Sequence, residues 1–362
     1  MYDVIIVGAG IAGSYLASLL DAGLNVLLLE KHKKTIPKDS GIVSRSFQTL
    51  FPDKTLIKTE ISDMKLMSPA GLSFFLRNDD PFAFILHRER FGLFLRREAR
   101  KQATIRYEAV QEIIDHRTHI EVRTNNGVYE CKLLVGCDGT NSVVRSFAHI
   151  PAPMISVGMM VKTKQRLDGP LRVYFNKHFS PDFFSWIIPQ NKEYGLITAH
   201  YPEDHCAFFQ KTFELPDGML SAHTIPTGLT RSYADRVLLV GDACGQNKPL
   251  TGGGIMFSLR GARCAAQVLN EAYHHNKLEY AHLQTYEQYW KKEFGFEIQK
   301  QLMVRKLYRR LSNHDIDQLF LKFGPSISSV RNFDYDHFSA VWRKLPKWEL
   351  LRFGLVHLHT LW

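Results

Sequence analysis

The sequence predicts an α/β fold with a parallel sheet at its centre and an antiparallel sheet interleaved with it. Three glycine-containing segments, 8–13, 136–145 and 241–255, each follow a short run of apolar residues of the kind that forms a buried strand. Between them the chain alternates apolar and polar residues and is rich in aromatic side chains, as in antiparallel strands with one covered face. We therefore expect the three segments in one domain and the intervening stretches in another.

The first glycine segment has the pattern of a phosphate-binding loop. It follows residues 3–7, whose sequence DVIIV predicts a central strand, and it precedes a helix expected to end near residue 20. Gly8 and Gly10 would allow a tight turn and the close approach of a pyrophosphate, and Gly13 would let the helix pack on the strand. The pattern predicts a dinucleotide site rather than an ordinary glycine turn.

An acidic residue follows the second predicted strand. Residues 25–29 have the sequence NVLLL, and Glu30 comes directly after them. A carboxylate in this place binds the ribose hydroxyls of a dinucleotide. The loop and the acid together do not distinguish FAD from NAD.

The second glycine segment follows another buried strand, predicted for residues 131–136. Asp138 and Gly139 come next, followed by Ser142 and Arg145. Taken alone, these residues are better explained by a turn and a helix cap. Their place between two other glycine segments favours a part in the same cofactor site.

The third segment has the sequence GDACGQNKPLTGGGI and follows a predicted strand at residues 236–240. Asp242, at the end of that strand, can accept hydrogen bonds from a ribityl hydroxyl. A triple-glycine turn at a helix start lets backbone N–H groups approach a pyrophosphate or a flavin ring. The glycines of this turn are Gly252, Gly253 and Gly254.

In this order, the three segments resemble the Rossmann-like FAD-binding fold of the p-hydroxybenzoate hydroxylase-type flavoproteins. The resemblance covers roughly residues 1–285. It implies that Glu30 binds the adenosine ribose and Asp242 the ribityl chain. It also implies that Asp138 and Gly139 lie near the cofactor and serve a nicotinamide donor as well.

The same resemblance implies an arginine that contacts FAD. Arg88, in the segment HRERFGLFL, matches this family arginine, and Arg90 is a weaker stand-in. The family usually has an aspartate after the phenylalanine of this segment, where this chain has Gly92. The chain departs from the family pattern at that position.

Residues 249–255 narrow the resemblance. Their sequence, PLTGGGI, is similar to that of geranylgeranyl reductases, which include archaeal enzymes that saturate the prenyl chains of membrane lipids. Hydroxylases of the class usually carry a histidine after Gly-Asp-Ala, where this chain has Cys244. The resemblance therefore favours the reductases over the hydroxylases.

Residues 181–189 have the sequence PDFFSWIIP and stand in the place of an aromatic element, Pro-x-x-Tyr-x-Trp-x-Phe-Pro, that lines the lipid tunnel of those reductases. A core strand of the second sheet explains the same side chains. The sequence is also one substitution from the Trp-x-Trp-x-Ile-Pro element of flavin halogenases. The substrate contacts that the reductase resemblance implies are Phe184, Trp186, Ile188 and Pro189.

Few residues are candidates for catalysis. Many reductases of this family place a cysteine before a glycine, facing the flavin, and Ser40 and Gly41 occupy those two positions here. Tyr174 and His178 are further candidates for an acid, although a structural role explains each of them better. The sequence names no catalytic acid.

Composition limits the class of protein. The chain has 362 residues, a formal net charge of +10 and 45% hydrophobic residues, as expected of a folded protein with anionic partners. Its five cysteines lack metal-ligand spacing, so we expect no metal site and reduced thiols in the cytoplasm. We find no signal peptide, no apolar stretch of about 18 residues and no nucleic-acid-binding motif.

The C-terminal region, residues 286–362, is predicted to be helical and basic. Its last part, residues 342–362, mixes tryptophans and basic residues with an apolar face. This pattern suits a peripheral membrane contact, and docking on the protein's own core explains it as well.

These patterns predict three regions. The FAD-binding domain comprises residues 1–45, 86–150 and 233–285, the substrate domain comprises residues 46–85 and 151–232, and the C-terminal region follows. The predicted function is an FAD-dependent reductase that saturates the double bonds of geranylgeranyl chains in lipids, with NADPH or ferredoxin as electron donor. It would act in the cytoplasm or peripherally on the cytoplasmic face of the membrane. The alternatives are a flavin monooxygenase or halogenase of the same fold and a non-catalytic lipid-binding flavoprotein.

Overall fold

The computed structural model describes residues 1–275, 280–331 and 333–336. The chain forms two compact units, and each draws on three separate stretches of sequence. Unit 1 comprises Met1–Pro37, His87–Ile155 and Pro226–Gln299, and unit 2 comprises Lys38–Leu86, Ser156–Ile225 and the chain from Lys300 onward.

Unit 1 contains an eight-stranded sheet whose main path is β17-β18-β11-β1-β2-β8, with β9 and β10 joined through β11. Strand β1 lies between β2 and β11 and is parallel to both. Its last four residues are buried, as expected for a strand that helices cover on both faces. The strands are β1 (Tyr2–Val7), β2 (Val26–Leu29), β8 (Thr104–Arg106), β9 (Val110–Asp115), β10 (Ile120–Thr124), β11 (Val128–Gly136), β17 (Tyr233–Ala234) and β18 (Val237–Leu239).

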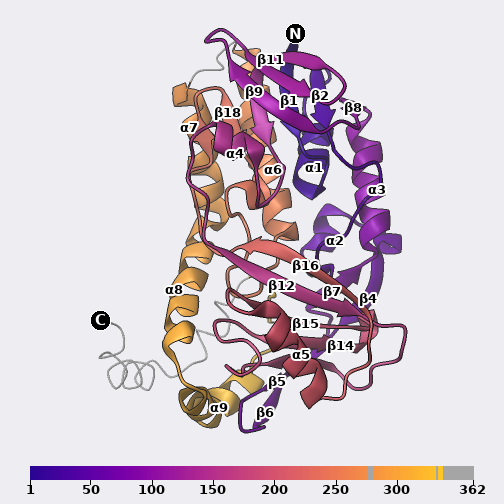
Figure 1. The fold of residues 1–362 in the computed structure, drawn as a ribbon, viewed down its shortest axis with the longest axis vertical. Helices are drawn as coiled ribbons and strands as arrows, with labels where there is room; N and C mark the ends of the chain where they lie inside the picture. Colours follow the sequence, from indigo (N-terminus) through magenta and orange to yellow (C-terminus); the bar gives the residue numbers. More distant parts are fainter. Residues whose placement is uncertain (276–279, 332, 337–362) are drawn as a thin grey trace. The chain divides into compact units, whose positions relative to one another are not determined.

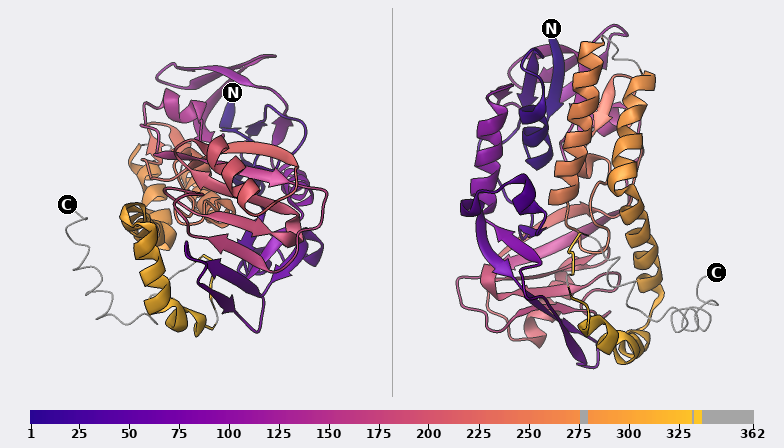
Figure 2. Two further views of the ribbon diagram at one scale, coloured as in Figure 1. Left: turned by 60° about the horizontal axis from the view of Figure 1, so that its bottom comes forward. Right: turned by 180° about the vertical axis from the view of Figure 1, so that it is seen from behind.

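The helices of unit 1 include α1, which packs against both α3 and α6 (Figure 1). Helices α6 and α7 lie side by side, as the right view of Figure 2 shows. A short π-helical turn, Lys291–Gly295, continues α7 into α8. The helices are α1 (Ile11–Leu19), α3 (Arg88–Ala99), α4 (Val143–Phe147), α6 (Ile255–His274), α7 (Tyr280–Trp290) and the start of α8 (Phe296–Arg310).

Unit 2 contains a seven-stranded sheet with the order β16-β12-β15-β14-β13-β5-β6. Four strand pairs are antiparallel, as predicted for this sheet: β12-β15, β15-β14, β14-β13 and β5-β6. Strands β13 and β5 pair in parallel. The strands are β5 (Asp63–Met67), β6 (Ser73–Arg77), β12 (Ile155–Lys162), β13 (Leu171–Tyr174), β14 (Ser185–Ile188), β15 (Glu193–Thr198) and β16 (Met219–Pro226).

A three-stranded sheet, ordered β3-β7-β4, and further helices also belong to unit 2. The remaining elements are β3 (Ile42–Ser44), α2 (Phe47–Leu50), β4 (Ile57–Ile61), β7 (Ala83–Leu86), α5 (Pro202–Thr212) and α9 (Asn313–Ser328). The predicted α/β class, with several sheets and a helical C-terminal region, is confirmed.

The C-terminal helices break between α8 and α9. Ser312 caps α9: its hydroxyl accepts a hydrogen bond from the backbone N–H of Asp315, whose carboxylate in turn accepts from the Ser312 N–H. The tryptophan-containing segment 342–362 lies outside the described residues. Within the part of the chain that the structure describes, no helix is both long and apolar enough to span a membrane.

Candidate cofactor and substrate sites

The first glycine loop is tightly packed at two of its glycines and open at the third. A Cβ on Gly8 would lie 2.5 Å from the carbonyl oxygen of Cys137, and a Cβ on Gly13 would lie 2.0 Å from that of Gly8. A Cβ on Gly10, by contrast, would meet nothing within 4 Å. Gly10 also directly precedes α1, where free N–H groups and the helix dipole favour an anion. The loop can therefore admit a pyrophosphate at Gly10.

Glu30 is held against this loop. Its Oε2 accepts a hydrogen bond from the N–H of Ala9 at 2.9 Å, and its Oε1 accepts one from the N–H of His32, also at 2.9 Å. Each carboxylate oxygen has a second lone pair for a further donor. The position of Glu30 suits hydrogen bonds to the ribose of a dinucleotide whose pyrophosphate lies beside Gly10.

Arg96, on α3, also binds this loop, although no sequence motif marks it. Its Nε donates to the carbonyl of Ala9 at 3.1 Å, its Nη1 donates to the carbonyl of Lys33 at 2.9 Å, and its Nη2 lies 3.6 Å from Glu30 Oε2. The signal that could have revealed it is its place on the buried face of α3, beside Leu95 and Ala99.

Arg88 is the first residue of α3 and is half-buried, while Arg90 is exposed. Packing explains why this chain has Gly92 where the family usually has an aspartate. A Cβ on Gly92 would lie 2.4 Å from Cγ2 of Thr35, so a side chain there would force the neighbouring segment to move.

The second segment combines the predicted helix cap with an unsatisfied acceptor. Oδ2 of Asp138 accepts from the N–H groups of Val143 and Val144, at 2.7 and 3.2 Å, at the start of α4. Its Oδ1 is buried and has no hydrogen-bond partner among the described residues, and burial raises the pKa of this carboxyl. A Cβ on Gly139 would meet nothing within 4 Å. A donor from a bound molecule would satisfy Oδ1.

The second and third segments are joined by Arg145, whose Nη1 donates to the carbonyl of Ala243 at 2.9 Å. Asp242 lies in a short 3-10 helix, Gly241–Ala243, and a Cβ on Gly254, the residue before α6, would be 3.0 Å from its Oδ1. The sequence did not mark out Lys248, whose side chain is 2% exposed and runs beside Gly253. The turn of Gly252 to Gly254 thus has a carboxylate and a cation beside it.

In unit 2, three of the four substrate contacts that the resemblance implies belong to or pack against one hydrophobic cluster, which we call the β14 cluster. Ile188 belongs to its buried centre, and the half-buried rings of Phe184 and Trp186 pack against it, 5.9 Å apart between centroids. Pro189 follows the strand and opens a short 3-10 helix. Ile188 is therefore a core residue, while the two aromatic rings retain exposed surface. Further members of the cluster are Ile61, Met64, Leu76, Phe82, Leu171, Val173, Val330 and Phe333.

Ser40 and Trp186 meet at a carboxylate that sequence reasoning missed. The hydroxyl of Ser40 donates to Oε1 of Glu193, and Nε1 of Trp186 donates to the same oxygen at 3.1 Å. Nδ2 of Asn191 donates to Oε2 at 2.8 Å. Glu193 is fully buried, and burial raises the pKa of its carboxyl. Gly41, next to Ser40, adopts a positive φ of 74°.

The other two candidate acids lie elsewhere. Tyr174 packs edge-on against Phe179 and Phe209 in a different cluster, and burial raises the pKa of its hydroxyl. His178 is exposed. The structure joins neither of them to Ser40.

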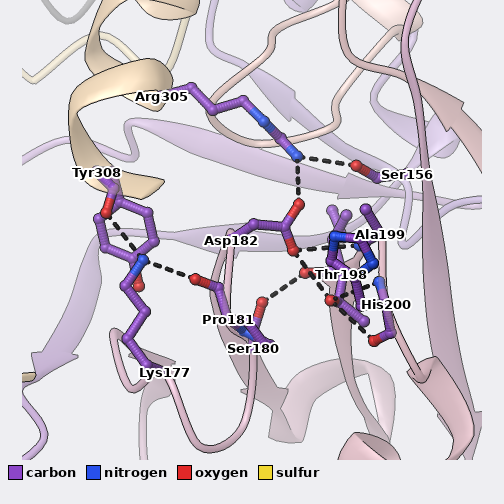
Figure 3. A network of polar contacts seen from close by, with 11 residues as sticks. Ser156, Lys177, Ser180, Pro181, Asp182, Thr198, Ala199, His200, Arg305 and Tyr308 are labelled. Carbon is purple, nitrogen blue, oxygen red and sulfur yellow. Dashed lines mark hydrogen bonds and ion pairs between the residues drawn. The ribbon is translucent and has the colours of Figure 1, made fainter. Parts of the chain in front are cut away.

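A buried polar network supports the β14 cluster from α8 (Figure 3). Nη2 of Arg305 donates to Ser156 Oγ at 2.8 Å and lies 3.3 Å from Asp182 Oδ2. The same guanidinium lies 4.0 Å from the ring centroid of Phe183, which stacks on Phe184. The network thus positions Phe183 and Phe184, the first aromatic residues of the segment 181–189.

The cysteines Cys131, Cys137, Cys206, Cys244 and Cys264 are free and buried. Among the described residues, no three His, Cys, Asp or Glu side chains are grouped so that they could hold a metal ion.

Comparisons with known proteins agree with this geometry. A family model described as an FAD binding domain matches residues 1–50. Digeranylgeranylglycerophospholipid reductase 2 of Methanopyrus kandleri is 26% identical over 356 residues, which cover 88% of this chain and 89% of that protein. Among solved structures, a geranylgeranyl bacteriochlorophyll reductase-like protein of Thermoplasma acidophilum matches with a TM-score of 0.86 and 19% identity, over 99% of each chain.

This chain has the FAD-binding fold of the geranylgeranyl reductase-like proteins. The resemblance predicted from the sequence is therefore confirmed, and with it the class of FAD-dependent oxidoreductases; the relatives of the chain are named geranylgeranyl-lipid reductases. Halogenase PltM also shares the fold, with a TM-score of 0.68 and 16% identity over 90% of this chain and 80% of its own.

Proposed function

We propose that the chain uses FAD to saturate carbon–carbon double bonds of geranylgeranyl chains in membrane lipids. Two observations support this function: the name of the reductase relatives, and the fit of unit 1 to a dinucleotide. The main evidence for this fit is that the space beside Gly10 is empty, whereas backbone atoms fill the space beside Gly8 and Gly13. A pyrophosphate needs such an opening at the start of a helix.

The residues of unit 1 would divide the cofactor between them. Gly10 would hold the pyrophosphate, Glu30 the adenosine ribose and Asp242 the ribityl chain, with Arg88 as a further contact. Gly252 to Gly254 would let the backbone approach the flavin, and Oδ1 of Asp138 offers a buried acceptor near the second glycine segment. When bound and reduced, FAD supplies the hydride that one alkene carbon receives.

In unit 2, Phe184 and Trp186 would contact the isoprenoid chain. Their rings present apolar surface beside a packed cluster, and an isoprenoid has no polar group for which a polar wall would be needed. Ile188 and Pro189 would support these rings from the strand and the following turn. The protein's part is to hold the double bond in place and to keep water away from it.

An external reductant, NADPH or ferredoxin, would reduce the cofactor. A peripheral membrane contact fits the exposed face of α8. Phe296 and Met303 are each 66% exposed and lie seven residues apart, with the exposed Lys306 and Arg310 on the same face. Apolar and basic side chains in this arrangement suit an anionic lipid surface on the cytoplasmic side of the membrane.

The test is a reduction without oxygen. The purified flavoprotein is reduced anaerobically and mixed with a phospholipid that carries geranylgeranyl chains, while flavin absorbance and lipid mass are followed. We expect the flavin to reoxidise as the lipid gains two hydrogen atoms per saturated bond. A flavin that stays reduced with lipid, yet reoxidises in air with an oxygenated or halogenated product, would instead support the monooxygenase or halogenase function that the fold shared with PltM allows.

A further inference from the structure

Glu193 links the candidate catalytic serine to the candidate substrate wall. Ser40 and Trp186 donate to the same carboxylate oxygen, although Ser40 lies 153 residues before Glu193 in the sequence. Asn191 donates to the other oxygen and also to the backbone carbonyl of Ser40, at 3.3 Å. The fold therefore brings a serine hydroxyl and the indole N–H of Trp186, which packs against the β14 cluster, to one carboxyl group.

The surroundings of Glu193 favour its neutral form. The carboxyl is fully buried and has no ion pair within 4 Å among the described residues, and its three hydrogen-bond donors are neutral groups. Two lysines interact with it at longer range, one on the paired strand β12 and one on β4 of the three-stranded sheet. Lys162 is its cross-strand partner on β12, and Lys58 on β4 donates to Asn191 Oδ1 at 2.7 Å. Burial is the largest effect and raises the pKa of Glu193, while the three donated hydrogen bonds and the charge of Lys162 oppose it.

A neutral carboxyl beside a serine can pass a proton onward. When Glu193 is protonated, its O–H can donate to Ser40 Oγ, which frees the serine hydrogen to point to another acceptor. Of the two groups that share Oε1, the Ser40 hydroxyl can both accept and donate, whereas Nε1 of Trp186 can only donate. Since an isolated alkene must gain a proton as well as a hydride, a proton source is needed beside an apolar wall of this kind.

We propose that Glu193 supplies the proton for alkene reduction through the hydroxyl of Ser40, an inference that rests on the proposed function. The bond between Ser40 Oγ and its hydrogen breaks as a C–H bond forms at the second alkene carbon. Ser40 takes the proton of Glu193 in turn, leaving a carboxylate that recovers a proton from solvent. The hydride and its electron pair come from reduced FAD, so the alkene is reduced by two electrons and gains two hydrogen atoms.

The experiment uses the anaerobically reduced holoenzyme and vesicles of a geranylgeranyl phospholipid, with saturation followed in single turnovers between pH 5 and pH 9. Wild type is compared with Glu193→Gln and Ser40→Ala. Matched controls are Asp317→Asn and Ser68→Ala, because Ser68 also donates to a carboxylate, Asp317 Oδ1, in the same unit. We expect both test variants to lose about 10²-fold or more in the saturation rate, and both controls to keep the wild-type rate.

The pH profile separates proton supply from a structural role. The wild-type rate should fall as pH rises through the pKa of Glu193, because only the protonated form supplies the proton. The residual rate of Glu193→Gln should not depend on that group. Infrared spectra of the oxidised holoenzyme give a readout without turnover: a protonated-carboxyl band should be present in wild type and Ser40→Ala and absent from Glu193→Gln.

The outcomes distinguish the two proposals. If wild type saturates the lipid and Glu193→Gln keeps its rate and pH profile, the proton route is overturned while the reductase stands. If wild type does not saturate the lipid, the proposed function fails and the proton route fails with it. If Glu193→Gln does not fold, Ser40→Ala decides: an unchanged rate and profile would overturn the route, and a large loss with the infrared band intact would support it.

Discussion

Arg305 and Asp182 form an ion pair inside unit 2, with 3.3 Å between Nη2 and Oδ2 and about 6% of each side chain exposed. Asp182 also accepts hydrogen bonds from Thr198 Oγ1 and from the N–H of Ala199, at 2.9 and 3.1 Å (Figure 3). Burial lowers the pKa of Arg305 to about 10, which still leaves it charged at neutral pH. The pair therefore fixes the end of α8 on the sheet at the cost of burying two charges.

Removing one partner of this pair should destabilise the protein. In Asp182→Ala the guanidinium of Arg305 stays buried without its carboxylate, so we expect the free energy of unfolding to fall by about 3–5 kcal/mol. Urea unfolding followed by circular dichroism measures this loss. The control is Asp168→Ala, which breaks an exposed pair with Arg166 and should leave the unfolding midpoint unchanged. Equal effects of the two variants would mean that the buried pair is well solvated.

The glycine loop allows cofactor binding to be separated from folding. Gly10→Ala adds a methyl group where nothing lies within 4 Å, so the free energy of unfolding of the apoprotein should change by less than about 0.5 kcal/mol. The affinity for FAD should fall at least tenfold, because the methyl group takes the space meant for the pyrophosphate. Fluorescence titration of the apoprotein with FAD measures the affinity.

Gly13→Ala is the matched variant. Its methyl group would lie 2.0 Å from the carbonyl oxygen of Gly8, so the loop must shift and the apoprotein should lose about 1–3 kcal/mol of stability. If Gly10→Ala binds FAD as wild type does, the pyrophosphate does not lie at Gly10.

What the sequence could predict was local in the chain. Gly8, Gly10 and Gly13 follow one strand and start one helix, so their spacing alone indicates both the turn and the phosphate loop. The strand expected at residues 3–7 is β1, and the carboxylate after the next strand, Glu30, does lie at the loop. Short-range patterns of this kind express backbone geometry directly.

What it could not predict depends on contacts between distant segments. Arg96 reaches a carbonyl 87 residues earlier, and Glu193 receives a hydrogen bond from a serine 153 residues earlier. In the sequence, Arg96 is one basic residue among several on a helix, and Glu193 is the first residue of an otherwise apolar strand. Only the folded chain shows that each of these ionisable groups is buried with several donors or acceptors around it.

The amino group of Lys177 should make stability depend on pH. Its Nζ donates to the carbonyls of Pro181 and Tyr308 at 2.6 and 2.8 Å, and burial lowers its pKa to about 8. The unfolded lysine keeps its proton up to its ordinary pKa near 10.5, so between pH 8 and pH 10.5 the unfolded state binds more protons. The contribution of Lys177 to stability therefore rises with pH in that window.

The comparison with Lys177→Met isolates this effect from other titrating groups. We expect the difference in unfolding free energy between wild type and variant to shift in favour of wild type from pH 7.5 to pH 10, as measured by urea unfolding at each pH. A neutral amine still has two N–H groups for the two carbonyls, so the hydrogen bonds survive deprotonation. A difference that does not change with pH would show that the folded lysine titrates as an exposed one does.

The exposed face of α8 should bind anionic lipid. Phe296 and Met303 supply apolar surface and Lys306 supplies charge, so the double variant Phe296→Ser and Met303→Ser should bind anionic vesicles about tenfold more weakly. Lys306→Gln should cost about fivefold, since a basic residue near an anionic surface contributes about 1 kcal/mol. Vesicle sedimentation at low and high salt measures both changes.

Leu93→Ser on α3 is the control for loss of an exposed apolar side chain, since Leu93 is 59% exposed. This variant should bind the vesicles as wild type does. If all the variants bind alike, the contact with lipid lies outside this face of α8.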